Sequence, residues 1–280
     1  MPDPHHPSAI GIGLAVAAVA AVYVLGLRRL GARSHGLPAW RCAAFLLGVA
    51  TIWAALGSTL ASCDAGSLTG HMVQHLLLMT IAPPLVLLGE PARVMVSGMP
   101  RLLQAIERRF PSRTSLRAAV ACWLAGSGTL VLWHVPSVFA LALRSPAWHA
   151  IEQLSFLVTG LFFWWPVIEP WPGWPLPSWS IVLYLFLATL PCDILSAFLV
   201  FSDRIVYSVY LSGESSAAVL ADQQCAGALM WTLVTLVYLV AGALVSARLL
   251  TFGNSPDQHT MASCATGAAP RPSVRTARVA

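Results

Sequence analysis

The sequence predicts an all-α polytopic membrane protein with seven transmembrane helices, its N-terminus outside and its C-terminus in the cytoplasm. Composition indicates the class: 57% of the 280 residues are hydrophobic and only 10% are charged, whereas a soluble domain is about 25% charged. The second observation is a series of apolar runs near the length that crosses a bilayer. The candidate helices cover roughly 9–27, 42–61, 71–89, 118–141, 148–168, 178–200 and 217–250.

The first and last apolar runs set the expected domain organisation. Arg28 and Arg29 follow the first run and no basic region precedes it, which predicts a retained helix and not a cleaved signal peptide. The last run exceeds one bilayer crossing and should project beyond the membrane. We expect one transmembrane unit over residues 1–250, with a short outer tail at 1–8. The remainder, 251–280, is rich in Ala, Ser, Thr and Pro and is expected to be a disordered cytoplasmic tail.

The arginines predict the orientation. All 16 basic residues are Arg, and 14 of them lie in the loops 28–41 and 90–117 or at the C-terminal end from position 248 onward. Basic loops stay on the cytoplasmic side, and only Arg144 and Arg204 fall on the other side. Because these arginines occupy loops and form no run with interleaved aromatic residues, the sequence predicts the lipid bilayer as a partner and excludes nucleic acid.

The inner loop 90–117 carries its own pattern. Apolar residues recur at helical spacing between arginines, at Leu102, Leu103, Ile106 and Phe110. This pattern predicts a short amphipathic helix on the inner membrane surface. In the preceding apolar run, Pro83 and Pro84 should end or kink the helix.

Ionisable residues inside the predicted spans are the candidates for function, because burying them in a bilayer is costly. They are His71, His75, His134, His149, Glu152, Asp193 and Asp222. No arginine lies within a span to neutralise the carboxylates, so a proton, a histidinium or a metal ion must do so. The predicted orientation places all of them in the outer part of the membrane, and this common depth indicates one site.

The spacing of these residues favours a metal site. His71 and His75 are four apart and His149 and Glu152 three apart, so each pair shares one helix face. Soft sulfur also lies near them in the chain, at Met72, Met79, Met230, Cys192 and Cys225. Imidazole with sulfur suits copper, in particular Cu(I), whereas imidazole with carboxylate suits zinc or iron. Purely structural roles, such as hydrogen bonding between helices and helix capping, remain open for each residue.

Three other classes of function compete with metal handling. One is a transporter or channel that uses the membrane carboxylates as a relay, although no internal repeat supports it. The spacing of His71 and His75 is that of zinc peptidases, but Met72 stands where their general base, a glutamate, follows the first histidine. An intramembrane zinc peptidase is therefore one alternative. Histidines on several helices also permit a haem-binding membrane protein.

Four blocks of sequence carry a resemblance to a known family. They are HMVQHLLLMTIAPPLVLLGEP at 71–91, WHVPSVFALAL at 133–143, WHAIEQLSFLVTGLFFWWPV at 148–167 and ADQQCAGALMW at 221–231. In this order they resemble the membrane-integral CtaG-type cytochrome c oxidase assembly factors, over roughly residues 40–250. The resemblance implies a non-catalytic protein of the bacterial inner membrane that has oxidase subunits as partners and handles copper for the oxidase.

The resemblance also implies a set of metal positions and shows one departure. The matching positions are His71, His75, His134, His149, Glu152, Asp193, Asp222 and Met230. The family commonly reads H-x-x-E-H in the fifth span, but this chain has Gln153 at the second histidine. A ligand at that position is lost or replaced here.

Overall fold

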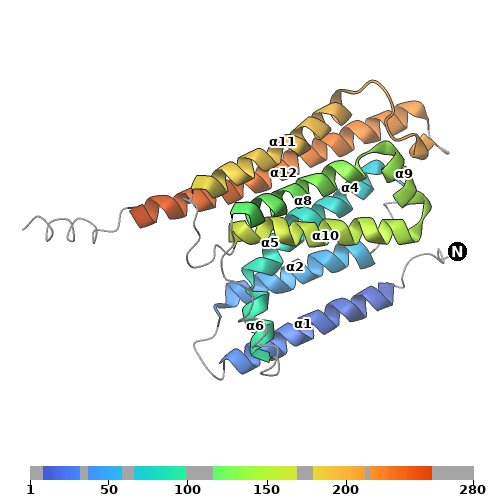
Figure 1. The fold of residues 1–280 in the computed structure, drawn as a ribbon. Coiled ribbons are helices and arrows are strands. Elements are labelled where there is room, and N and C mark those ends of the chain that lie inside the picture. Colours follow the sequence, from blue (N-terminus) through green and yellow to red (C-terminus); the bar gives the residue numbers. More distant parts are fainter. Residues whose placement is uncertain are drawn as a thin grey trace, which may run out of the picture.

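The computed structural model of the chain describes residues 9–31, 37–58, 66–98, 116–168, 179–211 and 215–253. Within these ranges every regular element is a helix, and there is no β-strand. Seven helical segments are long and apolar enough to cross a membrane. They run alongside one another as an elongated bundle (Figure 1), which confirms the predicted class and the seven spans.

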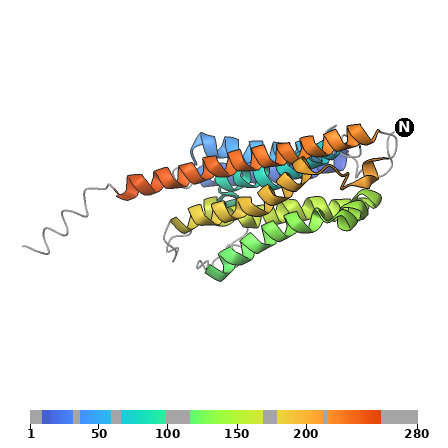
Figure 2. The same cartoon turned by 90° about the horizontal axis from the view of Figure 1, so that it is seen from above.

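The helices follow the apolar runs with small shifts at their ends. Their bounds are α1 (Ala9–Gly31), α2 (Ala39–Gly57), α4 (Leu68–Leu76), the π-helical segment η1 (Leu77–Ile81), α5 (Ala82–Leu88), α6 (Pro91–Gly98), α8 (Leu116–Trp133), α9 (Pro136–Arg144), α10 (Pro146–Ile168), α11 (Trp179–Phe201), the 3-10 turn η2 (Ser208–Leu211) and α12 (Ser216–Gly253). In Figures 1 and 2, α11 and α12 lie along each other for most of their length.

The third span, formed by α4, η1 and α5, is the most enclosed of the seven. In its most apolar stretch 61% of the residues are buried, against 11–39% in the other spans. Helices α2, α10 and α12 pack against it. The other spans expose many large apolar side chains, as expected for surfaces that face lipid. The two histidines predicted on the third span therefore lie on the helix best shielded from lipid.

The double proline changes the third span without ending it. Pro83 has no amide hydrogen, so the carbonyl of Met79, four residues earlier, lacks its usual helical partner. The chain widens into the π-helical segment just before the prolines and then continues as α5. The indole Nε1 of Trp164 donates to the Met79 carbonyl at 3.1 Å. Gly160 permits this approach, because a Cβ there would lie 3.0 Å from both the Met79 carbonyl and Pro83.

The fourth predicted span, 118–141, is divided into α8 and α9. Pro136 begins α9, and Val135 before it has φ −66° and ψ 123°, an extended conformation. A proline disfavours the helical conformation in the residue before it, which explains the break. His134 lies in the link between the two helices, so its position depends on this proline.

Three predictions fall wholly or partly beyond the described residues. The amphipathic helix around Leu102–Phe110 lies outside them, although α6 occupies the first part of that loop. The predicted tail overlaps the described chain only at its start, where α12 continues to Gly253. The predicted outer tail at 1–8 also lies outside the described residues. The orientation across the membrane stays a prediction. The starts of α1, α4, α10 and α12 lie at one end of the bundle, which we call the histidine end (Figure 1).

Candidate metal centre

Two histidines of α4 and a glutamate of α10 meet inside the bundle. The Oε1 atom of Glu152 lies 3.4 Å from Nε2 of His71 and 3.3 Å from Nε2 of His75. The two Nε2 atoms are 2.7 Å apart and share a hydrogen bond. We call these three residues the His/Glu cluster; their candidate ligand atoms all lie within 4.8 Å of one another. The predicted convergence of the third and fifth spans is thus present in the structure.

Burial makes this cluster unusual. The side chains of His71 and Glu152 are 0% exposed and that of His75 is 6% exposed. Phe139 packs edge-on against the His71 ring, and the Phe156 ring lies 4.2 Å from that of His75. Among the described residues, no arginine pairs with Glu152, and its Oε2 has no hydrogen-bond partner. A buried carboxylate of this kind needs a positive charge or a proton in the cluster.

The start of α4 is fixed by side chains that cap it. The Ser67 hydroxyl accepts from the amide of Gly70 at 3.0 Å. The carboxylate of Asp222 accepts from the amides of Leu68 at 2.6 Å and Thr69 at 3.3 Å. These bonds satisfy amide groups that a helix start leaves without partners. Asp222 therefore joins α12 to α4 as a cap and is not a member of the His/Glu cluster.

His149 lies beside the cluster but points its Nε2 elsewhere. Its ring stacks on that of His71, with 5.7 Å between the centroids. The side-chain amide of Gln153 lies 3.0 Å from Nε2 of His149. Since that amide nitrogen donates, His149 Nε2 accepts and is engaged within its own helix. Gln153, the departure from the family pattern, thus contacts the neighbouring histidine directly.

His134 is held in a defined tautomer. Its Nδ1 lies 2.7 Å from the carbonyl oxygen of Leu130, to which it must donate. Its own carbonyl accepts from the hydroxyl of Tyr207 at 3.0 Å. The other ring nitrogen, Nε2, is buried and has no hydrogen-bond partner among the described residues. It therefore presents a lone pair to the interior of the bundle.

Met230 and Asp193 complete the predicted set. Met230 is buried and lines the same small cavity as His75 and His134. Asp193 is half-buried on α11 and does not reach the His/Glu cluster. Its Oδ1 lacks a hydrogen-bond partner in the part of the chain that the structure describes. The structure thus brings together six of the eight predicted residues near one place and separates Asp193 and Asp222 from the cluster.

Sequence reasoning missed the residues that position the site. Trp164 fixes the π-helical segment, Tyr207 fixes the link at His134, and Gln74 ties α4 to α2 through a 2.8 Å bond to the Ala55 carbonyl. Gln74 carried a signal, because it is a polar residue placed between the two histidines of an apolar run. The aromatic residues gave no such signal among many others in the spans.

The donor atoms of the cluster fit a metal ion in type and nearly in spacing. Two imidazole nitrogens and one carboxylate oxygen suit zinc or copper. Two ligands at about 2.1 Å from one ion in tetrahedral geometry lie about 3.4 Å apart, and the two N···O separations are 3.4 and 3.3 Å. The 2.7 Å separation of the nitrogens is shorter, so binding would move the rings apart and displace the shared proton.

Comparison with known proteins gives the family. The sequence profile described as "cytochrome c oxidase caa3 assembly factor" matches residues 21–251. The uncharacterized proteins Mb0105 of Mycobacterium bovis and MT0111 of Mycobacterium tuberculosis are each 27% identical over 257 residues. These matches cover 84% of this chain but 38% of each relative, so the chain spans well under half the length of these proteins. No solved structure gives a significant match.

The family match begins within α1, ends near the end of α12 and includes every residue of the His/Glu cluster. The chain therefore belongs to the cytochrome c oxidase caa3 assembly factors, the Caa3_CtaG family.

Proposed function

We propose that this protein is a non-catalytic assembly factor of the bacterial cytoplasmic membrane that binds copper on the outer side and assists its insertion into cytochrome c oxidase. The observation that carries the proposal is the fully buried Glu152 held between His71 and His75. A bound cation would balance the carboxylate, and two imidazoles would complete a site of low coordination number. The family supports the oxidase as the partner.

The other predicted residues would act around this core. His134 and Met230 line one small cavity together with His75 and would supply further nitrogen and sulfur. His149 packs on His71 and would keep that ring in place. Asp222 would fix the start of α4, and with it the depth of both histidines. Asp193 would add negative charge on α11 and attract a cation to this end of the bundle.

In this proposal copper is the cargo, and side chains of this protein bind and release it. Neutral imidazoles leave the ion with few strong ligands, which favours transfer to another protein. Phe139 and Phe156 exclude water from the cluster and so strengthen the attraction between the ion and Glu152. The cluster lies near the start of α4 and α10, at the histidine end, where a partner in the membrane could receive the ion.

A copper titration tests the site. The purified full-length chain in nanodiscs is titrated with Cu(I) against a chromophoric chelator. The wild type should bind copper stoichiometrically, and His71→Ala and His75→Ala should each weaken binding by about 10-fold or more. Cys122→Ala is the matched control, because it removes a metal-capable side chain of α8 that is absent from the cluster. Wild-type affinity in both histidine variants would show that the site lies elsewhere.

Cells can separate copper delivery from chaperoning of an oxidase subunit. A deletion strain should lose oxidase activity, and the wild-type gene should restore it while the His71→Ala variant should not. Added copper should restore activity in part if the protein delivers the ion. Full oxidase activity in the deletion strain would contradict the assembly role itself.

A zinc-dependent enzyme is the second candidate, because two histidines and a glutamate are also the ligand set of catalytic zinc sites. In this arrangement Glu152 would be a ligand, and Met72 leaves the position of the usual general base without a carboxylate. The same nanodisc preparation loaded with Zn(II) should show no cleavage of membrane peptides. A visible Soret band in the purified protein would instead indicate haem.

A further inference from the structure

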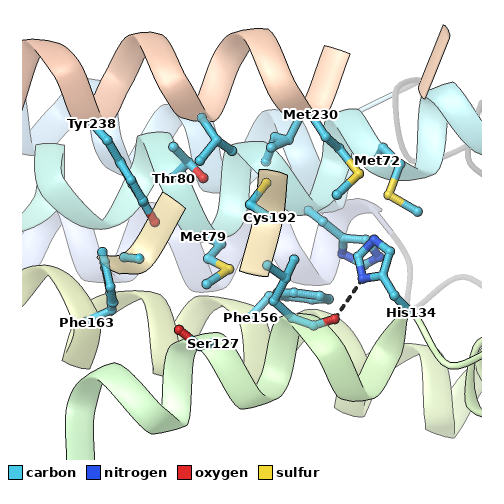
Figure 3. Close-up of a pocket in the computed structure, with 15 residues that line it drawn as sticks. Met72, Met79, Thr80, Ser127, His134, Phe156, Phe163, Cys192, Met230 and Tyr238 are labelled. Atoms are coloured by element: carbon cyan, nitrogen blue, oxygen red, sulfur yellow. Dashed lines mark hydrogen bonds between the residues drawn. The ribbon is translucent and has the colours of Figure 1, made fainter. Parts of the chain in front are cut away.

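A small cavity next to the His/Glu cluster concentrates sulfur. It has a volume of about 30 Å³, enough for a single ion or water but far too small for a haem. Met72, Met79, Met230 and Cys192 line it together with His75 and His134. In Figure 3 the sulfur atoms of Met72 and Met230 and the ring of His134 gather toward one end of the cavity. The sulfur and histidine residues of the lining come from four parts of the chain: the third span, the link between α8 and α9, α11 and α12.

His134 is the observation that points to a ligand in this cavity. Methionine and cysteine are common packing residues and alone would indicate nothing. The Nε2 atom of His134, however, is buried without a hydrogen-bond partner among the described residues, and its residue lines this cavity. The bond from Nδ1 to the Leu130 carbonyl fixes the tautomer that leaves Nε2 free to bind an ion. Metal-ligating histidines are typically oriented by such a bond.

The chemistry of the lining selects the ion. Thioether sulfur and a neutral imidazole are soft or borderline ligands, and they favour Cu(I) over Zn(II). The remaining walls are mainly apolar. The cavity thus differs from the His/Glu cluster, which offers a carboxylate oxygen and no sulfur.

We propose that this cavity is a second coordination position for Cu(I), with Met72, Met230 and His134 as its ligands. His75 belongs to the His/Glu cluster and also lines the cavity, so one ion can pass between the two positions by exchanging ligands at His75. No electron is transferred, because the ion stays Cu(I) throughout. This inference rests on the proposed function and specifies where the ion is held between arrival and release.

The test uses the full-length chain in nanodiscs, loaded with one equivalent of Cu(I), and X-ray absorption at the copper edge. The wild type should show sulfur as well as nitrogen neighbours. The double variant Met72→Leu/Met230→Leu should lose the sulfur neighbours and bind Cu(I) about 10- to 100-fold more weakly. Its binding of Co(II), a probe of the His/Glu cluster, should not change. Leucine conserves the volume of methionine, so packing is largely kept.

The control is Met95→Leu, which removes a methionine of α6 that does not line the cavity and should leave both metals unchanged. Only nitrogen and oxygen neighbours around Cu(I) in the wild type would overturn the second position, whatever the variants do. Retained Cu(I) affinity in the double variant would overturn it as well. Other outcomes would contradict the proposed function itself. In these, the wild type binds no copper, or His71→Ala leaves the binding of both copper and Co(II) intact.

Discussion

Two glutamates in this protein occupy opposite environments. Glu90 follows α5 and pairs with Arg41 of α2 and with Arg93 of α6, the latter at 3.0 Å. Its side chain is 23% exposed. Glu152 is fully buried, and its only ion-pair partners in the described part of the chain are imidazole nitrogens. Both are carboxylates in an apolar bundle, but one has permanent cations as partners and the other has groups that gain or lose charge.

The difference separates an ion pair with permanent charges from a cluster whose charges can change. Arginine keeps its charge in proteins, so Glu90 is always neutralised. Around it the Tyr23 hydroxyl donates to the Gly89 carbonyl at 2.7 Å, and Glu90 itself adopts a positive φ of 49°. These contacts fix the turn from α5 into α6. His71 and His75 can gain or lose a proton, so Glu152 is balanced only by a proton or a cation held in the cluster.

The largest expected effect comes from removing the buried charge. Glu152→Gln should weaken copper binding by about 100-fold or more, because a ligand and the balancing charge are both lost. Glu90→Gln should leave copper affinity unchanged. Chelator competition measures both, and circular dichroism checks that the helices remain. Equal losses in the two variants would remove the distinction between the glutamates.

The π-helical segment lies between these two regions, and Trp164 holds it. Trp164→Phe removes the donor to the Met79 carbonyl and leaves that buried acceptor without its partner. We expect a loss of about 1–3 kcal/mol in the free energy of unfolding, measured by SDS titration in bicelles. Trp148→Phe, at an exposed position on α10, is the control. An unchanged midpoint for Trp164→Phe would show that the carbonyl has another partner.

Substitution of Asp222 tests whether this carboxylate at the histidine end only caps α4 or also binds metal. Asp222→Ala should destabilise the protein by about 0.5–2 kcal/mol through loss of the α4 cap. Its effect on copper affinity should be smaller than that of Glu152→Gln, since Asp222 only positions the helix. Asp222→Asn keeps a capping oxygen and should recover most of the stability. A loss of copper binding in Asp222→Asn as large as in Glu152→Gln would instead make Asp222 a ligand.

The smallest effect is expected at Glu90. Its partners are partly exposed, with Arg41 at 30% and Arg93 at 57%, so solvent screens the attraction. Glu90→Gln should lower stability by at most about 1 kcal/mol. The loss should shrink as salt is added. A large, salt-insensitive loss would mean that this carboxylate is as enclosed as Glu152.

The sequence allowed the seven spans and the meeting of His71, His75 and Glu152 to be predicted, because apolar length and helix periodicity are local properties. It could not show that Asp222 caps α4, since that contact joins residues more than 150 positions apart. The division at Pro136 was readable in principle, but apolar residues on both sides gave an unbroken hydropathy signal. The π-helical segment depends on Trp164 and Gly160 of another helix, so the prolines alone predicted only a kink.

The length of α12 bears on how the protein sits in its bilayer. Its apolar stretch, Ser216–Ala247, has 32 residues and extends about 48 Å, whereas a hydrocarbon core is about 30 Å thick. Such a helix can shift along the membrane normal and still fill the hydrocarbon core with apolar residues. Its length alone therefore does not fix its depth in the bilayer. The vertical position of Met230 must be set by neighbouring helices, among them α4 and α11. The protein should then tolerate bilayers of differing thickness at this helix, with tilt absorbing the excess length.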